Sequence, residues 1–183
     1  MGRNDRFLAR MMQRDVVTGS NIFVDTNHAQ VHEGNAFSFY VKASIAPGGT
    51  LFVGMQTAPN AYLHVQRIGL SLLAAVGTLY LVEEPVYTGG TAVIVHNHNR
   101  VRPMKVSSTA IVLNPTVTEA GNNLMCLTLD GGKQGQITTG SVGSISDEYV
   151  FSPNMKYGWR LHNDNGSTLE AVVNMFWYDE GAG

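Results

Sequence analysis

The sequence predicts an all-β protein, an antiparallel β-sandwich with a short helical arm at its N-terminus. Short runs of aromatic and β-branched residues recur along the 183 residues, between turn signals built from Gly, Pro, Asn and Asp. Hydrophobic residues make up 44% of the chain, which is enough for a packed core. Only 14% of the residues are charged, against about 25% in typical globular proteins. A charge-poor surface suits a β-sandwich, and also a protein that buries surface against partners.

Residues 1–20 form the predicted arm, and residues 21–183 form the predicted β-sandwich domain. Four of the 12 basic residues are arginines spaced three or four positions apart, so a helix over residues 3–14 places them on one face. An isolated helix this short is marginal in water and needs a surface to dock on. The side chains expected to contact a partner are Arg3, Arg6, Phe7, Arg10, Met11 and Arg14. Docking on an acidic neighbouring subunit competes with two alternatives, a solvated helix face and a weak, salt-sensitive contact with nucleic acid.

Period-two patterns predict the strands of the domain in order. The first candidates along the chain are Ile22–Asp25, His28–His32, Ala36–Ile45 and Thr50–Met55. Residues 61–84 have the length of a helix, but Gly69 and Gly77 disfavour one. We therefore expect two long antiparallel strands there, with a turn near residues 74–77.

The second half of the domain continues this pattern. Its expected strands are Ala92–Val95, Val106–Leu113, Asn123–Leu129, Glu148–Phe151, Tyr157–His162 and Thr168–Tyr178, while residues 136–146 form a loop or a weak edge strand. The last two strands flank the polar turn Asn163–Gly166 and are predicted to form a hairpin. So many short strands are typical of a β-sandwich or barrel.

No motif in the sequence indicates catalysis. Phosphate-binding loops, dinucleotide fingerprints and nucleophile elbows are absent. The single cysteine, Cys126, lies in a strand-like run and is predicted to be a buried, inert thiol. We therefore expect a protein that is not an enzyme, with no catalytic residues and no cofactor.

His96 and His98 are the only candidates for a metal site. Residues two apart on a strand share a face, so two imidazoles there would be able to hold one cation. The pair resembles the first histidine motif of cupins, which are β-barrels. Arg102 stands in the region where that motif needs a glutamate, and together with Arg100 it would repel a cation. The prediction is therefore no metal, and a polar turn over residues 97–100.

Aromatic residues leave a carbohydrate-binding module as a further alternative, because sugars stack on exposed rings. The rings concerned are Phe37, Phe39, Tyr40, Trp159, Phe176, Trp177 and Tyr178. Phe37 and Phe39 share one face of their strand, and Phe176 and Tyr178 share a face of theirs. We expect most of these rings to lie in the core.

The charge balance does not favour nucleic acid or membrane as a partner. A net charge of −2 produces no strong global field. The most apolar window, residues 68–82, contains glycines and is shorter than the about 20 residues of a spanning helix. No secretory signal is recognisable, so we expect synthesis in a cytoplasm and no membrane contact.

Several short motifs occur in a familiar order over residues 31–178. They are His32-Glu33-Gly34, Thr57-Ala58-Pro59, Gly89-Gly90-Thr91, Asn97-His98-Asn99-Arg100 and the aromatic run Met175–Tyr178. This order resembles a group of tailed-bacteriophage virion proteins.

The resemblance implies a jelly-roll-like β-sandwich that decorates or cements a capsid. Its partners would be the major capsid protein and neighbouring copies of itself, in a homo-oligomer. Its place would be the virion, after synthesis in the cytoplasm of the host bacterium. A phage tail or fiber-adaptor protein is the alternative within this group, and a cupin-like metal-binding enzyme is the alternative outside it.

Overall fold

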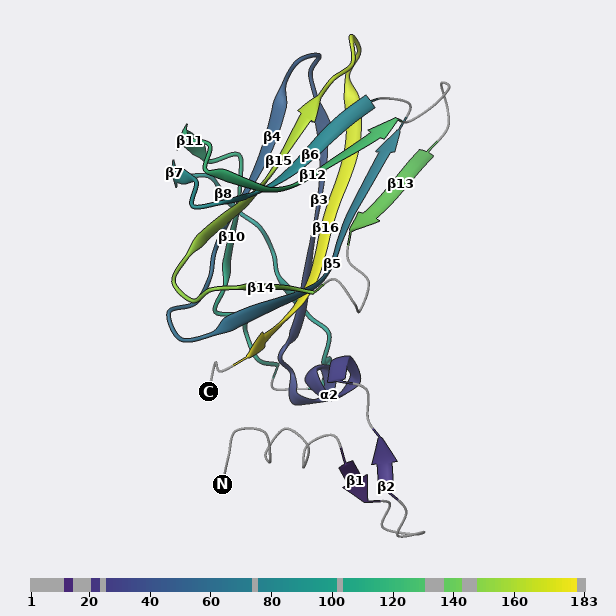
Figure 1. Ribbon diagram of the computed structural model, residues 1–183, viewed down its shortest axis with the longest axis vertical. Helices are drawn as coiled ribbons and strands as arrows, with labels where there is room; N and C mark the ends of the chain where they lie inside the picture. The colour runs from purple at the N-terminus through teal and green to yellow at the C-terminus, as the bar shows by residue number, and fades with distance from the viewer. Residues whose placement is uncertain are drawn as a thin grey trace.

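Two antiparallel β-sheets pack face to face in a computed structural model that describes residues 12–14, 21–23, 26–73, 76–101, 104–130, 137–142 and 148–180 (Figure 1). We name each sheet after its central long strand. The β15 sheet has the order β12 (Asn122–Asp130), β6 (Val76–Glu83), β15 (Lys156–Asn163), β4 (Thr50–Gln56), β10 (Ala110–Leu113) and β8 (Thr91–Ala92). The β16 sheet has the order β13 (Ile137–Val142), β5 (Tyr62–Leu73), β16 (Leu169–Glu180), β3 (Ala36–Ile45) and β9 (His96–Asn97), and β14 (Tyr149–Phe151) also pairs with β5.

The strand order is that of a jelly roll. Strands β3-β16-β5-β13 lie opposite strands β4-β15-β6-β12. From β3 to β6 the chain changes sheet at every connection, and it changes sheet again between β12 and β13 and between β15 and β16. This order interlocks two Greek keys, which defines the eight-stranded jelly roll. The fold class predicted from the sequence is therefore confirmed.

The core lies between the sheets and is built by the alternation of side chains along each strand. In β16, the residues from Leu169 to Trp177 are alternately buried and half-buried. Three aromatic rings form the centre of the core: the Phe39 ring lies 5.7 Å from Trp159 and 6.2 Å from Trp177. Each of the three is at most 1% exposed. Rings of this size bury about 150–250 Å² each, so they supply a large share of the hydrophobic stabilisation.

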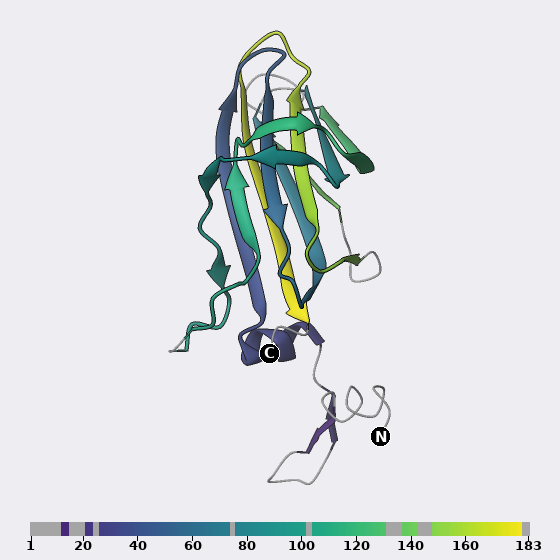
Figure 2. The same cartoon turned by 90° about the vertical axis from the view of Figure 1, so that its left-hand side faces the viewer.

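The connection between β6 and β12 is a long insertion, residues 84–121, that no sequence motif revealed. Two of its strands, β7 (Val86–Thr88) and β11 (Thr116–Glu119), pair with each other. Its strands β8 and β10 extend the β15 sheet, while β9 extends the β16 sheet beside β3. The insertion thus borders both sheets along one side of the sandwich (Figure 2).

The segments before the sandwich differ from expectation. Strands β1 (Met12–Arg14) and β2 (Asn21–Phe23) pair antiparallel, so the predicted helix is wrong over residues 12–14, and its residues 3–11 lie outside the described residues. The strand predicted over His28–His32 is also wrong, because helix α2 (Thr26–Glu33) occupies this stretch. Gly34 ends the helix with a φ of 76°, a left-handed conformation that favours glycine. No helix in the described part of the chain is long and apolar enough to cross a membrane.

Two further predictions fail. The strands β15 and β16 do not form a hairpin but belong to opposite sheets, which lie about 10 Å apart. The buried Asn163 holds the crossing chain, because its amide donates hydrogen bonds to the carbonyls of Ile45, Ala46 and Ser167. Cys126 is exposed rather than buried, because its side chain lies on the outer side of β12 and alternates with the half-buried Met125 and Leu127.

Candidate functional site

The predicted docking residues fall mostly outside the described residues. Of the six, Arg3, Arg6, Phe7, Arg10 and Met11 precede β1. Arg14 is the last residue of β1, where its backbone pairs with Asn21. The docking role of the arm therefore remains a prediction.

His96 and His98 lie at the outer surface of the β16 sheet, where each imidazole has its own protein partner. The His96 ring stacks on Tyr40, with an interplanar angle of 6° and a centroid distance of 5.9 Å. His98 Nε2 lies 2.9 Å from Ser38 Oγ, and its ring contacts the Phe176 ring edge-on at 4.8 Å. Burial lowers the pKa of His98, and the nearby charges of Arg67 and His96 lower it further.

The environment of this pair does not suit a cation. Arg67 stands close enough to disfavour a second positive charge. Across the described ranges, no group of three or more His, Cys, Asp or Glu side chains could hold a metal ion. Asn97, between the two histidines, is buried and donates hydrogen bonds to the carbonyls of Gly34 and Lys105.

The polar turn expected over residues 97–100 is present. The Asn97 side chain accepts a hydrogen bond from the Asn99 backbone at 2.7 Å, and the Asn99 side chain accepts one from the Val101 backbone at 2.9 Å. These are two successive turns of the type in which an asparagine side chain replaces a backbone acceptor. The Asn99 amide also donates to the His32 carbonyl, which fixes the insertion against the end of α2.

Rings and imidazoles from four strands gather on the outside of the β16 sheet. We call this surface the aromatic face and define it by Tyr40, His64, Arg67, His96, His98, Phe176 and Tyr178. Tyr40 is 65% exposed, whereas Phe37 and Phe39 on the opposite side of the same strand are buried. The register brings the face together, because Phe176 lies directly between Ser38 of β3 and Arg67 of β5.

One end of the aromatic face holds a histidine between two carboxylates. His64 Nδ1 lies 3.1 Å from Glu148 Oε1, and His64 Nε2 lies 2.8 Å from Glu180 Oε2. The His64 ring stacks on Tyr178 at 4.6 Å with an interplanar angle of 7°. Burial raises the pKa of Tyr178 well above its usual range, and the neighbouring Glu148 and Glu180 raise it further. These contacts connect β5 and β16 with Glu148, the residue that precedes β14.

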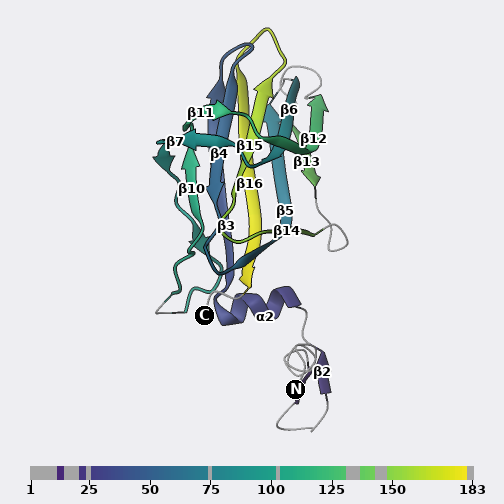
Figure 3. The same ribbon diagram turned by 60° about the vertical axis from the view of Figure 1, so that its left-hand side comes forward.

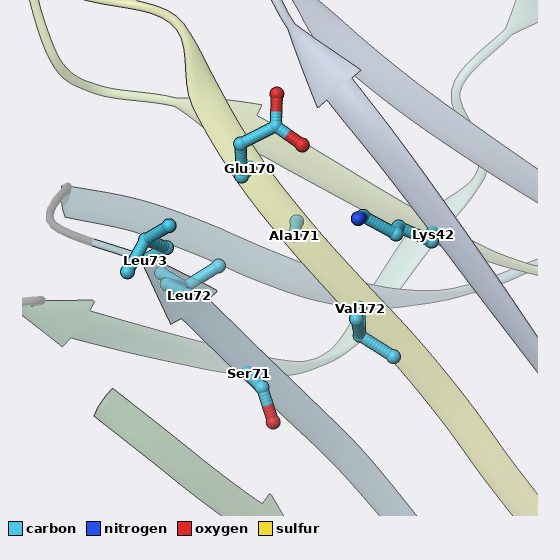
Figure 4. A pocket seen from close by; sticks show the side chains of 7 residues that line it. All are labelled: Lys42, Ser71, Leu72, Leu73, Glu170, Ala171 and Val172. Atoms are coloured by element: carbon cyan, nitrogen blue, oxygen red, sulfur yellow. The ribbon is translucent and has the colours of Figure 1, made fainter. Parts of the chain in front are cut away.

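A shallow hollow of about 260 Å³ lies on the other end of the same sheet (Figure 4). Leu73 and Val172 give it an apolar lining, and Lys42 and Glu170 place one charge of each sign at its side. Glu170 is already held by a hydrogen bond from the Ser44 hydroxyl. The hollow suits an apolar side chain of a partner better than a charged ligand.

The outer face of the β15 sheet is arranged differently, because part of it is covered. Strands β7 and β11 cross it, and the Tyr87 ring lies over Gly54 so closely that a Cβ atom at position 54 would be 2.7 Å from the ring. Phe52 contacts the same ring at 6.0 Å between centroids, and Lys156 Nζ lies 4.6 Å from its centre. Burial raises the pKa of Tyr87 to about 12. A second hollow of about 330 Å³ remains beside this cover, between Val117 and Arg160.

Comparisons with known proteins do not assign this chain to a family. No protein-family model matches the chain, and no curated protein sequence matches it. Among solved structures, the VP2 subviral particle of infectious bursal disease virus is similar at 9% identity, with a TM-score of 0.19, over 90% of this chain and 45% of that chain. The structure of infectious bursal disease virus strain Gx is similar at 10% identity, with a TM-score of 0.18, over 89% and 43%. The chain spans less than half the length of these viral chains, and the jelly-roll assignment rests on the strand order alone.

Sequence reasoning identified some members of the aromatic face and missed others. It expected Phe176 and Tyr178 to share a face, and they do. It did not find His64 of β5, Glu180 of β16 and Glu148, which precedes β14, because these residues form no motif along the chain. Only the pairing of β14 and β16 with β5 brings these three side chains together.

Proposed function

We propose that this chain is a non-enzymatic structural protein of a virion, namely a bacteriophage decoration or cement protein that binds and stabilises the capsid. The observation that carries the proposal is a jelly roll whose interior is filled by its own side chains. Ligand-binding barrels keep a cavity between their walls. Here Trp159, Trp177 and Phe39 occupy that space, so the outer surface is what remains for function.

The order of the short turn motifs in the sequence is the reason for proposing a phage virion protein. Two of the motifs that resemble phage virion proteins, Gly89-Gly90-Thr91 and Asn97–Arg100, lie in the insertion that borders both sheets. A cement protein needs contacts of this lateral kind, because it bridges neighbouring subunits of a shell. The major capsid protein and further copies of this chain are the proposed partners, and the basic arm is the proposed docking element.

Binding to capsids that lack this protein tests the proposal. Full-length protein should co-sediment with such capsids and raise the temperature at which they open. A variant without residues 1–16 should keep the circular dichroism spectrum of the folded sandwich but lose most of the binding. Full binding by the truncated protein would remove the arm from the mechanism, and absence of binding by the full chain would refute the capsid role.

Charge reversal tests whether the arginines of the arm, rather than its apolar residues, bind the capsid. The triple variant Arg3→Glu, Arg6→Glu and Arg10→Glu should bind capsids at least tenfold more weakly, with the difference shrinking at high salt. The matched control is the triple variant Arg3→Lys, Arg6→Lys and Arg10→Lys, which keeps the positive charge of the arm and should bind like the wild type. Distribution over the whole head indicates a cement protein, whereas a few copies at one vertex would indicate the tail or fiber-adaptor alternative.

A further inference from the structure

The two long sides of the sandwich end in different ways. On one side, the outermost strands are β8 and β9, which have two residues each and belong to the insertion. On the other side, the outermost strands are β12 and β13, which have nine and six residues (Figure 3). Within the described ranges, no strand pairs with the outer edge of either one.

Strand β12 has few of the features that protect an edge. Natural edge strands are usually short, or carry lysine, proline or inward-pointing charges, because an open row of backbone donors and acceptors invites pairing. Strand β12 contains no proline and no basic residue, and its one charge is Asp130 at the last position. A bulge at residues 123–125 interrupts only its beginning, so Met125–Asp130 pairs regularly with β6 and leaves its other edge open.

The side chains of β12 show an incompletely covered core. Met125 and Leu129 pack against the core but stay half-buried, and Leu127, which lies between them on the same side, is half-buried too. In the neighbouring sheet interior, Trp159 and Leu161 of β15 are each 1% exposed. Cys126 and Thr128 alternate with this apolar row and are exposed on the outer side. Covering the row would bury apolar surface that the single chain leaves in water.

We propose that β12 pairs antiparallel with β12 of a second copy of this chain, about a twofold axis at Leu127. The β15 sheets of the two copies would then form one continuous sheet. This register places Met125 opposite Leu129 of the other copy, and Leu127 opposite itself, so the inward apolar rows meet. It also keeps the bulge outside the paired region.

A second copy fits this edge because the row Met125, Leu127 and Leu129 is complementary to itself, and the charge of β12 favours the antiparallel orientation. The antiparallel arrangement puts the two Asp130 residues just beyond opposite ends of the paired segment Met125–Leu129, about 20 Å apart along the strands. A parallel arrangement would place them side by side and make them repel each other. A twofold axis uses the same patch on both copies, which is the most frequent symmetry of soluble oligomers.

Mass in solution tests the pairing. The isolated wild-type chain should elute at twice its mass of 19.8 kDa when measured by light scattering. The double variant Cys126→Lys and Thr128→Lys changes only exposed positions and brings four ammonium groups together across the axis, so it should be monomeric with an unchanged circular dichroism spectrum. The matched control, Thr116→Lys and Thr118→Lys on the exposed strand β11, should stay dimeric.

Cysteine cross-linking tests the register. In the proposed pairing Cys126 lies opposite Thr128 of the other copy, at a Cα separation of about 4.5–5.5 Å that a disulfide can span. Under mild oxidation Thr128→Cys should therefore give covalent dimers, whereas wild type and the variant Thr128→Cys with Cys126→Ser should not. A monomeric wild type, a dimeric double-lysine variant, or cross-linking that does not need both cysteines would overturn the proposal. Because these tests use isolated protein, their failure leaves the proposed capsid role untouched.

Discussion

The two outer faces of the sandwich use their aromatic residues in opposite ways. On the β15 sheet, Tyr87 is part of a cover and its ring packs against the sheet at Gly54. On the β16 sheet, Tyr40 and His96 stack on each other and remain open to solvent. The Tyr87 ring packs against the protein and stabilises it, whereas the Tyr40 ring stays on the surface. Ring content in the sequence therefore does not separate a structural face from an interaction face; the difference comes from the insertion that covers one of them.

Removing one ring from each face should give the largest contrast. Tyr87→Ala should lower the free energy of unfolding by about 3 kcal/mol, because a buried ring and its packing are lost. Tyr40→Ala should change it by about 0.5 kcal/mol or less, since the ring is exposed. Urea denaturation measures both. Tyr87→Phe serves as the control and should be close to neutral, because the buried Tyr87 hydroxyl has no hydrogen-bond partner among the described residues. Equal losses for the two alanine variants would contradict the contrast.

A buried carboxyl group should make stability depend on pH in the opposite sense to most acids. Asp179 lies inside the sandwich, where it accepts hydrogen bonds from Trp177 and Ser107. Burial raises its pKa from 3.8 to about 6. The folded state therefore binds this proton more tightly than the unfolded state, so the contribution of Asp179 to stability is greatest below pH 4 and falls as the pH rises to 6. The loss amounts to at most about 3 kcal/mol.

The variant Asp179→Asn isolates this effect. Its free energy of unfolding should lack the decline between pH 4 and 6.5 that the wild type shows, and it should be at least as stable as the wild type at pH 7.5. Glu119→Gln, on the exposed strand β11, is the control and should follow the wild type. If the asparagine variant kept the full decline, the buried carboxyl would not be its cause.

Two glycines provide the smallest and most closely matched contrast. A Cβ atom at Gly54 would lie 2.7 Å from the Tyr87 ring, and one at Gly69 would lie 2.6 Å from the Asn174 side chain. Gly54→Ala should cost about 1–3 kcal/mol, because the ring is held by the cover. Gly69→Ala should cost less than about 1 kcal/mol, because Asn174 can swing into solvent and alanine is favoured over glycine in a strand. In a Tyr87→Ala background the Gly54 penalty should disappear, and its persistence would show that the ring is not responsible.

The strands were predictable from the sequence where one face of each is buried. The segments over Ala36–Ile45 and Leu169–Glu180 alternate between core and surface over most of their length, and this alternation is visible in the chain. Thr50–Gln56 is instead buried at every position from Leu51 to Met55. The pairing partner of each strand was not predictable, because the same alternation fits two strands joined in a hairpin and two strands in opposite sheets. The polar turn Asn163–Gly166 looked like a hairpin turn, but its Asn163 amide is used to hold a crossing.

Helix α2 and the contacts of the aromatic face could not be predicted from the strand patterns of the sequence. Helix α2 has little amphipathic character, and only Gly34 after it marks a helix end. His96 and His98 were singled out as a pair, but the register gave each ring a different partner, Tyr40 for one and Phe176 for the other. The cluster around His64 joins residues up to 116 positions apart and appears only once the sheet is assembled.

The copy number and location of this chain in purified particles test the proposed function most directly. Heads and detached tails would be separated on a gradient, and the chain would be quantified against the major capsid protein by mass spectrometry. A cement protein should be found with the heads, in a fixed simple ratio to the major capsid protein. Absence from the particles, or recovery with the tails in a few copies, would contradict the account.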